Sequence, residues 1–232
     1  MSVLAGATIA FDLDGTLVDT APDLVRAINQ VLHEQGLAPL AYDKARVMVG
    51  RGAKSLIEQG YAATGLPLSP DNSPALVERF IAVYRERIAA ESRPFPGVVE
   101  ALETLAHAGA ELVVCTNKRT DLSIALLDAL DLSRHFTAVV GADAAPAAKP
   151  DARHLIFAIE QSGGDVAHAL MVGDSITDVN AAKNAGVPVI VTSFGYTDIP
   201  PADLGAAAVI DHFDQLPELA LGLLSQPRIA RA

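Results

Sequence analysis

The sequence predicts an α/β protein in which a parallel sheet, with helices on both faces, is interrupted by an inserted all-helical domain. From residue 94 onward, short apolar segments alternate with helical patterns, which is typical of parallel sheets with right-handed crossovers. Residues 19–92 show helical patterns alone, and this block is too long to be one crossover helix. Several apolar segments are followed by Asp, Thr or Asn, at the strand ends where open α/β sheets place their ligands.

The predicted sheet begins with a short buried strand at residues 7–12. Later apolar segments predict strands at 112–115, 138–140, 170–172, 187–191 and 207–210. Periodic apolar positions predict helices at 98–109, 121–130, 153–161 and 177–185, and a last helix from Asp214. We therefore expect a Rossmann-like core made of residues 1–18 and 94–232.

The block at residues 19–93 predicts an inserted helical domain. Its first helix starts at a capping-box pattern, Thr20 to Asp23, with Pro22 in the first turn, and stops near Gly36. Further helices are expected at 43–48, through Leu56 and Ile57, and from Ser73 with a stripe of apolar positions at Leu76, Phe80, Tyr84 and Ile88. The turn-forming residues at 94–97 (PFPG) mark the point where the chain returns to the sheet.

Composition and charge exclude several classes of protein. Half of the 232 residues are hydrophobic, which is enough for a sizeable core, and the net charge is −11 with a pI near 4.8. A protein that binds nucleic acid would show a basic face, so we expect no nucleic-acid partner. Cys115 lies in an apolar run and is expected in the core, and no segment approaches the roughly 18–20 apolar residues of a membrane span. With about eleven uncharged residues before Asp12, we also expect no signal peptide and a cytoplasmic protein.

Acidic, hydroxyl and basic side chains follow the predicted strands. Asp12 and Asp14 come directly after the first strand, and their two-residue spacing points both to one side while the strand lasts. The other strands are followed by Thr116 and Asn117, by Lys149, and by Asp174 with Asp178 four residues on. In a parallel sheet these groups converge at one edge, and the oxygen ligands suit Mg²⁺ and a phosphoryl group.

Each of these features also has a simpler explanation. Asp12 and Asp14 could be solvated carboxylates in an Asp-Gly turn. Lys149 could be an exposed loop lysine, and Asp178 could be a first-turn acid favoured by the helix dipole. The agreement of all four strand ends favours one functional site.

The motifs together resemble a phosphatase of the haloacid dehalogenase-like superfamily. They are DLDGT at 12–16, CTN at 115–117, KP at 149–150 and GDSITD at 173–178, in that order. Similar stretches at 94–98 and 182–188 extend the resemblance over most of the chain, and the helical insert resembles the family's cap domain.

The resemblance implies a role for each motif residue. Asp12 would be the nucleophile that forms an aspartyl-phosphate, and Asp14 the acid and base that handles the proton of the leaving group and of water. Mg²⁺ would be held by Asp12, Asp174 and the backbone carbonyl of Asp14. Thr116, the Asn117 backbone and Lys149 would hold phosphoryl oxygens. Asp178 would orient a metal-bound water or Lys149 from behind the metal.

The substrate is expected to be a small phosphate monoester. Asp14 favours phosphate esters or a sugar-phosphate mutase, because dehalogenases and phosphonate-cleaving relatives lack an acid there. The stretch 47–56 (VMVGRGAKSL) resembles bacterial phosphoglycolate phosphatases, which implies 2-phosphoglycolate. Arg51, and with less weight Lys54, are candidate contacts for its carboxylate.

Other functions stay open at this point. The site could serve another small phosphoester or pyrophosphate, or a mutase, and a catalytically idle domain that binds a partner is a remote alternative. The six histidines show no ligand spacing and are expected at the surface or on helix faces. We expect a monomer or weak homodimer that acts on a small phosphorylated substrate, with no nucleic-acid or membrane partner.

Overall fold

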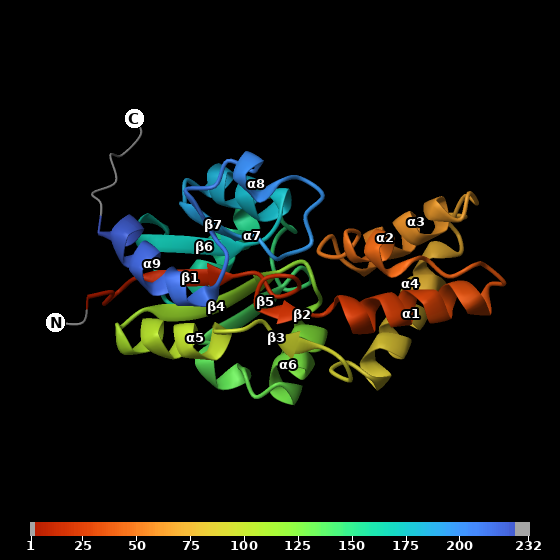
Figure 1. Cartoon of the computed structure of the whole chain (residues 1–232), viewed down its shortest axis with the longest axis horizontal. Helices are drawn as coiled ribbons and strands as arrows, with labels where there is room; N and C mark the ends of the chain where they lie inside the picture. The colour runs from red at the N-terminus through yellow and green to blue at the C-terminus, as the bar shows by residue number, and fades with distance from the viewer. Residues whose placement is uncertain (1–2, 226–232) are drawn as a thin grey trace.

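The fold consists of an α/β core and a helical cap that projects from one end of it (Figure 1). The structure is a computed structural model in which residues 3–225 are described. The cap is inserted after the first strand of the core, as the sequence predicts, and the chain returns from the cap to build the rest of the sheet.

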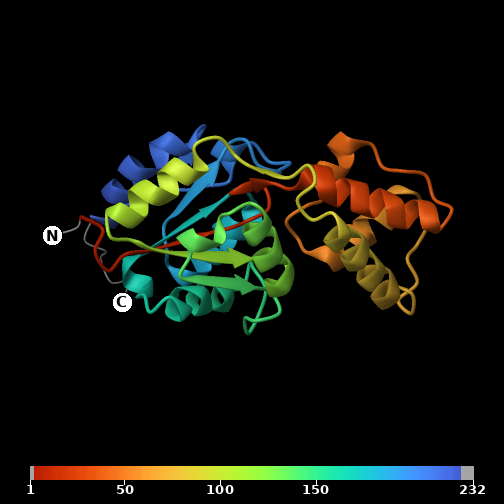
Figure 2. The ribbon, with the colours of Figure 1, turned by 90° about the horizontal axis from the view of Figure 1, so that it is seen from below.

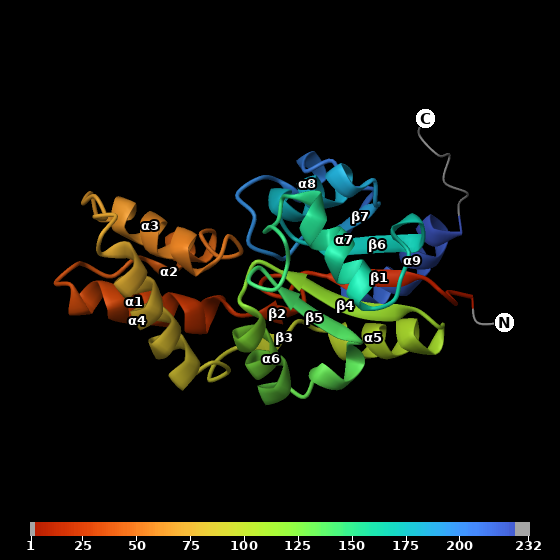
Figure 3. The same ribbon diagram turned by 180° about the vertical axis from the view of Figure 1, so that it is seen from behind.

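The core contains a parallel sheet with the strand order β5-β4-β1-β6-β7-β8. The strands are β1 (Thr8–Phe11), β4 (Glu111–Thr116), β5 (Ala138–Gly141), β6 (Ala169–Gly173), β7 (Val189–Thr192) and β8 (Ala208–Ile210). From β1 the chain builds outward through β4 and β5, then crosses to β6 on the other side of β1 (Figure 3). The order therefore reverses at β1, and the crevice at such a reversal is where this type of sheet binds ligands.

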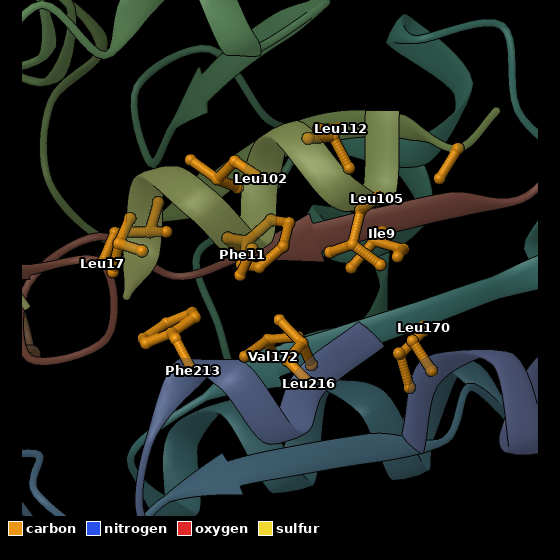
Figure 4. Close-up of a cluster of buried hydrophobic side chains, with 14 of the residues drawn as sticks. Ile9, Phe11, Leu17, Leu102, Leu105, Leu112, Leu170, Val172, Phe213 and Leu216 are labelled. Carbon is orange, nitrogen blue, oxygen red and sulfur yellow. The ribbon is translucent and has the colours of Figure 1, made fainter. Parts of the chain in front are cut away.

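Helices cover both faces of the sheet, because successive residues of each strand point to opposite sides. The helices are α5 (Val98–His107), α6 (Thr120–Ala129), α7 (Ala152–Gln161), α8 (Ile176–Ala185) and α9 (Leu216–Leu224). Phe11 and its neighbours pack with α5, α6 and α9 (Figure 4), whereas Ala10 packs with α7 and α8 on the other face. Figure 2 shows α5 and α9 on one side of the sheet and α7 on the other.

Shorter elements complete the core. Single-turn 3-10 helices within the described residues span Ser133–His135, Val166–His168, Pro201–Asp203 and Phe213–Gln215. The predicted last helix is α9, which packs on the sheet, and the tail beyond residue 225 lies outside the described residues. Among residues 3–225, no helix combines the length and the apolar character needed to cross a bilayer.

The cap is a bundle of helices around its own apolar cluster. Its helices are α1 (Ala21–Glu34), α2 (Tyr42–Arg46), α3 (Ala53–Ala63) and α4 (Ser73–Glu86). The predicted stripes are buried there, including Ile28, Ile57 and Phe80. Two predicted helix ends are wrong: α2 stops before Met48, and α4 stops before Ile88.

Two short strands hold the points where the chain leaves and re-enters the core. β2 (Val18–Asp19) pairs antiparallel with β3 (Arg93–Pro94). The sequence indicated helices alone from residue 19, and the pairing places Asp19 in a strand instead. A strand of two residues is too short to leave a periodic signal.

The capping box predicted at Thr20 is also wrong. The Thr20 hydroxyl makes no capping hydrogen bond, and Asp23 turns its carboxylate toward the returning chain. Asp23 Oδ2 accepts hydrogen bonds from the Glu91 amide (2.9 Å) and from the amide and hydroxyl of Ser92 (both 2.8 Å). Asp23 is fully buried, so it joins the two chain segments at the base of the cap.

The first prediction concerns this junction. Asp23→Ala leaves two amide donors without an acceptor, so the free energy of unfolding falls by about 2–4 kcal/mol in urea titrations. Asp71→Ala, which removes an exposed carboxylate of the cap, serves as the control and is expected to change little.

The same variant has a defined pH dependence. Burial opposes ionisation, but hydrogen bonds from Glu91 and Ser92, with Arg26 nearby, outweigh it and lower the pKa of Asp23. The contribution is therefore present at neutral pH and is lost as the pH falls through the folded-state pKa. If the difference in free energy of unfolding between the unmodified protein and Asp23→Ala became larger as the pH fell, this account would be contradicted.

Candidate active site

Asp12 lies at the carboxyl end of β1, in the crevice where the strand order reverses. Its amide continues the sheet by donating to the Val172 carbonyl (2.9 Å), and the residue is 3% exposed. Burial is the main cause that raises the pKa of Asp12 to about 6, with Asp178 and Asp14 adding to it and Lys149 opposing it. Asp12 Oδ1 lies 2.9 Å from the Lys149 ammonium.

A glycine turn places Asp14 beside Asp12 but gives it a different partner. Gly15 has a φ of +86°, and a Cβ there would lie 2.6 Å from Asp174 Oδ2, so glycine fits this position both in conformation and in space. The Asp14 carboxylate accepts two hydrogen bonds from Lys118 Nζ, at 3.0 and 3.2 Å. The two acids of the first motif are therefore paired with two separate lysines.

The end of β4 contributes Thr116 and Asn117. Thr116 is buried at 1% exposure, and the strand is in register with β1 through the pair Phe11 and Val114. The Asn117 side chain accepts from the Lys149 amide (2.9 Å) and donates to the Lys149 carbonyl (3.1 Å). Asn117 thus fixes the loop that carries the catalytic lysine candidate.

Lys149 lies between two acids in the interior. Its ammonium is 2.6 Å from Asp178 Oδ1 and 2.9 Å from Asp12 Oδ1, and the residue is 4% exposed. Burial would lower the pKa of Lys149, but the neighbouring Asp12 and Asp178 carboxylates outweigh it and hold the pKa above its ordinary value. Lys149 is therefore a fixed positive charge.

His154 lies on a helix, as expected, but it faces the interior of the protein. It is fully buried on α7, its Nδ1 accepts from the Lys149 amide (3.2 Å), and its Nε2 lies 3.3 Å from the Val140 carbonyl. Burial, helped by the charge of Lys149, lowers the pKa of His154 to about 4. The neutral imidazole of His154 thus holds the backbone of the Lys149 loop through this hydrogen bond.

Asp174 and Asp178 follow β6 and have different hydrogen-bond partners. Asp174 Oδ1 accepts from the Thr16 hydroxyl (3.1 Å) and Oδ2 from the Tyr196 amide (2.7 Å). Asp178 Oδ1 accepts from Lys149, and Oδ2 caps the start of α8 through the amide and hydroxyl of Ser175 (3.1 and 2.8 Å). Both oxygens of Asp178 are used by the protein.

The site carries an excess of negative charge that suits a divalent cation. Carboxylate oxygens of Asp12, Asp174 and Asp178 lie within 4.8 Å of one another. Burial, together with Asp178 and Asp12, raises the pKa of Asp174 well above its ordinary value. Among the described residues, the site buries four carboxylates against two ammonium groups: Asp12, Asp14, Asp174 and Asp178 against Lys118 and Lys149. Two surplus charges on hard oxygen donors fit a cation such as Mg²⁺.

A small cavity of about 60 Å³ lies between this site and the cap. Asp14, Asn117 and Lys118 line it from the core, and α3 and α4 line it from the cap with residues such as Leu56 and Tyr84. The cavity wall is largely apolar apart from the groups beside Asp14.

The predicted cap contacts, Arg51 and Lys54, do not line this cavity, although the neighbouring Gly50, Gly52 and Ala53 do. Arg51 is exposed and lines a separate cavity of about 20 Å³ with Ser175 and Tyr196. Lys54 has a 74% exposed side chain that lies 3.8 Å from Glu58. The substrate role of Arg51 stays a prediction.

Sequence reasoning missed several residues that hold the site together. Lys118 directly follows the CTN motif, so its position at the strand end was a usable signal. Tyr84 is indistinguishable from a core aromatic in the helical stripe. Tyr196 joins Asp174 to the cap base by donating from its hydroxyl to Asp19 (2.6 Å) and accepting from the Ala21 amide (2.9 Å), and no sequence pattern indicates this.

Comparison with known proteins agrees with this geometry. The family model of the haloacid dehalogenase-like hydrolases matches residues 9–192. The phosphoglycolate phosphatase of Caulobacter vibrioides is 60% identical over 222 residues, covering 96% of this chain and 94% of the relative. That of Agrobacterium fabrum is 48% identical over 206 residues, covering 89% and 88%.

A solved structure shows the same fold. The crystal structure of a predicted phosphoglycolate phosphatase from Haemophilus somnus superposes with a TM-score of 0.85 at 29% identity, covering 93% of this chain and 98% of that one. The chain belongs to the haloacid dehalogenase-like hydrolase family.

Proposed function

We propose that the protein is a magnesium-dependent phosphatase that hydrolyses 2-phosphoglycolate to glycolate and phosphate. The observation that carries the proposal is the pair of neighbouring acids with separate cations, Asp12 with Lys149 and Asp14 with Lys118. Paired carboxylates in different surroundings can divide the work of nucleophile and proton carrier. The names of the similar proteins from Caulobacter and Agrobacterium support this substrate.

Asp12 acts as the nucleophile. A carboxylate oxygen of Asp12 forms a bond to phosphorus while the bond from phosphorus to the ester oxygen breaks, which gives an aspartyl-phosphate and splits the hydrolysis into two steps. Lys149 holds Asp12 in place and supplies a positive charge to the phosphoryl oxygens. The Thr116 hydroxyl and the Asn117 amide hold the remaining oxygens.

Asp14 moves the protons of both steps. Its proton passes to the ester oxygen as glycolate leaves, and the resulting carboxylate takes a proton from the water that attacks the aspartyl-phosphate. The second step restores Asp12 as a free carboxylate, restores the proton on Asp14 and releases phosphate. Asp14 is close to Asp12 in sequence and faces the cavity, so it can reach the leaving oxygen.

The carboxylates of Asp12 and Asp174 and the backbone carbonyl of Asp14 would hold Mg²⁺. The ion supplies the positive charge that lets a carboxylate approach a dianionic phosphate. Asp178 acts on the site indirectly, because it holds Lys149 and the start of α8. Thr16 and Tyr196 orient Asp174 through its two oxygens.

The size of the cavity favours a small ester as the substrate over the sugar phosphate that a mutase would bind. Asp14 lines the cavity of about 60 Å³, and this small volume supports a two-carbon leaving group. The other properties expected from the sequence complete the proposal: a cytoplasmic enzyme, monomeric or weakly dimeric, acting without nucleic-acid or membrane partners.

A substrate panel tests the proposal. With Mg²⁺, kcat/KM for 2-phosphoglycolate is expected to exceed that for glucose 6-phosphate, glycerol phosphate, pyrophosphate and p-nitrophenyl phosphate. A chelator should abolish the activity and added Mg²⁺ should restore it, because the buried acids require the cation. Equal rates on all esters would refute the substrate, and full activity in the chelator would refute the metal.

Asp14→Asn tests the proton carrier. We expect kcat/KM for 2-phosphoglycolate to fall by roughly 10²–10⁴-fold. The fall for p-nitrophenyl phosphate should be much smaller, because nitrophenolate leaves without a proton. Asp203→Asn, at an exposed position of the core, is the control. Equal losses on the two esters would show that Asp14 does not protonate the leaving group.

A further inference from the structure

Lys118 brings a buried positive charge to the wall of the cavity between core and cap. Its side chain is 5% exposed, and its ammonium lies 3.0 and 3.2 Å from the two Asp14 oxygens. The same ammonium lies 4.4 Å from the centre of the Tyr84 ring on α4. Lys118 is thus held by an acid of the core and an aromatic ring of the cap.

The other cations near this cavity are committed elsewhere. Lys149 is held by Asp12 and Asp178. Arg119 also lines the cavity, but its 43% exposed side chain pairs with Asp121 at 3.1 Å and lies 3.8 Å from Glu78. Among residues 3–225, Lys118 is therefore the buried cation that faces this space.

The shape of the substrate brings its carboxylate to this position. In 2-phosphoglycolate one methylene group separates the ester oxygen from the carboxylate carbon. Because Asp14 acts at that ester oxygen, the substrate carboxylate must lie beside Asp14. A substrate carboxylate that enters a largely apolar cavity is stable there only when a cation pairs with it.

We propose that Lys118 binds the carboxylate of the substrate and makes the enzyme selective for phosphate esters that carry one. This inference rests on the proposed function and names the selecting residue. An ammonium has three N–H donors, so Lys118 can donate to the substrate while it keeps a contact with Asp14. The ring of Tyr84, on the cap, adds a cation–π contact that holds the ammonium at the cavity wall.

The test uses two esters that differ in one group. They are 2-phosphoglycolate and 2-hydroxyethyl phosphate, in which CH₂OH replaces the carboxylate. Lys118→Met removes the charge and keeps the apolar stem. The ratio of the two kcat/KM values is expected to fall by about 10- to 100-fold, the scale of a charged hydrogen bond in a buried site. Lys44→Met, which removes an exposed charge of the cap, should leave the ratio unchanged.

The ratio separates binding from positioning. If Lys118 only orients Asp14, Lys118→Met lowers both rates equally, the ratio stays, and the inference is overturned. The inference also fails if the ratio is lost in Arg51→Met and kept in Lys118→Met. An unmodified enzyme that does not prefer 2-phosphoglycolate would instead refute the proposed function itself.

A charge-balanced pair covers the case in which Lys118→Met does not fold. Asp14→Asn/Lys118→Met removes both partners, so no charge is buried alone, and Asp14→Asn is its control. Calorimetry should show that Asp14→Asn binds 2-phosphoglycolate more tightly than 2-hydroxyethyl phosphate, and that the double variant does not distinguish them. A preference that survives in the double variant would contradict the role of Lys118.

Discussion

The ammonium of Lys149, held between Asp12 and Asp178, is the interaction on which the site depends. It joins the end of β1 to the start of α8 across the crevice at which the strand order reverses. Buried ions are stable only when their partners are complete, and here Asp12 and Asp178 are those partners. Asn117 and His154 fix the backbone of Lys149 by accepting hydrogen bonds from its amide. The charges still do not balance, and the proposed Mg²⁺ would offset the surplus of two carboxylates.

The cap contributes to the site through contacts that begin at its base. Asp23 joins the segments that enter and leave the cap. Tyr196 joins the entering segment to the core, because it donates its hydroxyl to Asp19 and its amide to Asp174. Further along the cap, Tyr84 packs on the ammonium of Lys118. The cap is thus connected to both halves of the site: to the carboxylate cluster through Tyr196, and through Lys118 to Asp14, the proposed proton carrier. Substrate selection by Lys118 would follow from the second connection.

Much of this arrangement could be predicted from the sequence, because the strand ends leave polar residues at fixed places in an alternating pattern. The α/β core, the helical insert and the gathering of Asp12, Lys149 and Asp174 at one edge required only the rules for parallel sheets. The supporting residues could not be predicted in this way. His154 and Tyr84 occupy ordinary helical positions, Tyr196 lies in a loop, and Asp23 bonds to a segment about 70 residues away. Their roles arise from tertiary contacts that leave no local pattern.

The claim that Asp12 forms a covalent intermediate can be tested most directly by rapid acid quench. The enzyme is mixed with Mg²⁺ and 2-phosphoglycolate, stopped within the first turnover, digested and examined by mass spectrometry. The account predicts a phosphoryl group on the peptide that contains Asp12, and none in Asp12→Asn. Glycolate released in the first turnover without any phosphorylated peptide, or a phosphoryl group on another residue, would contradict it.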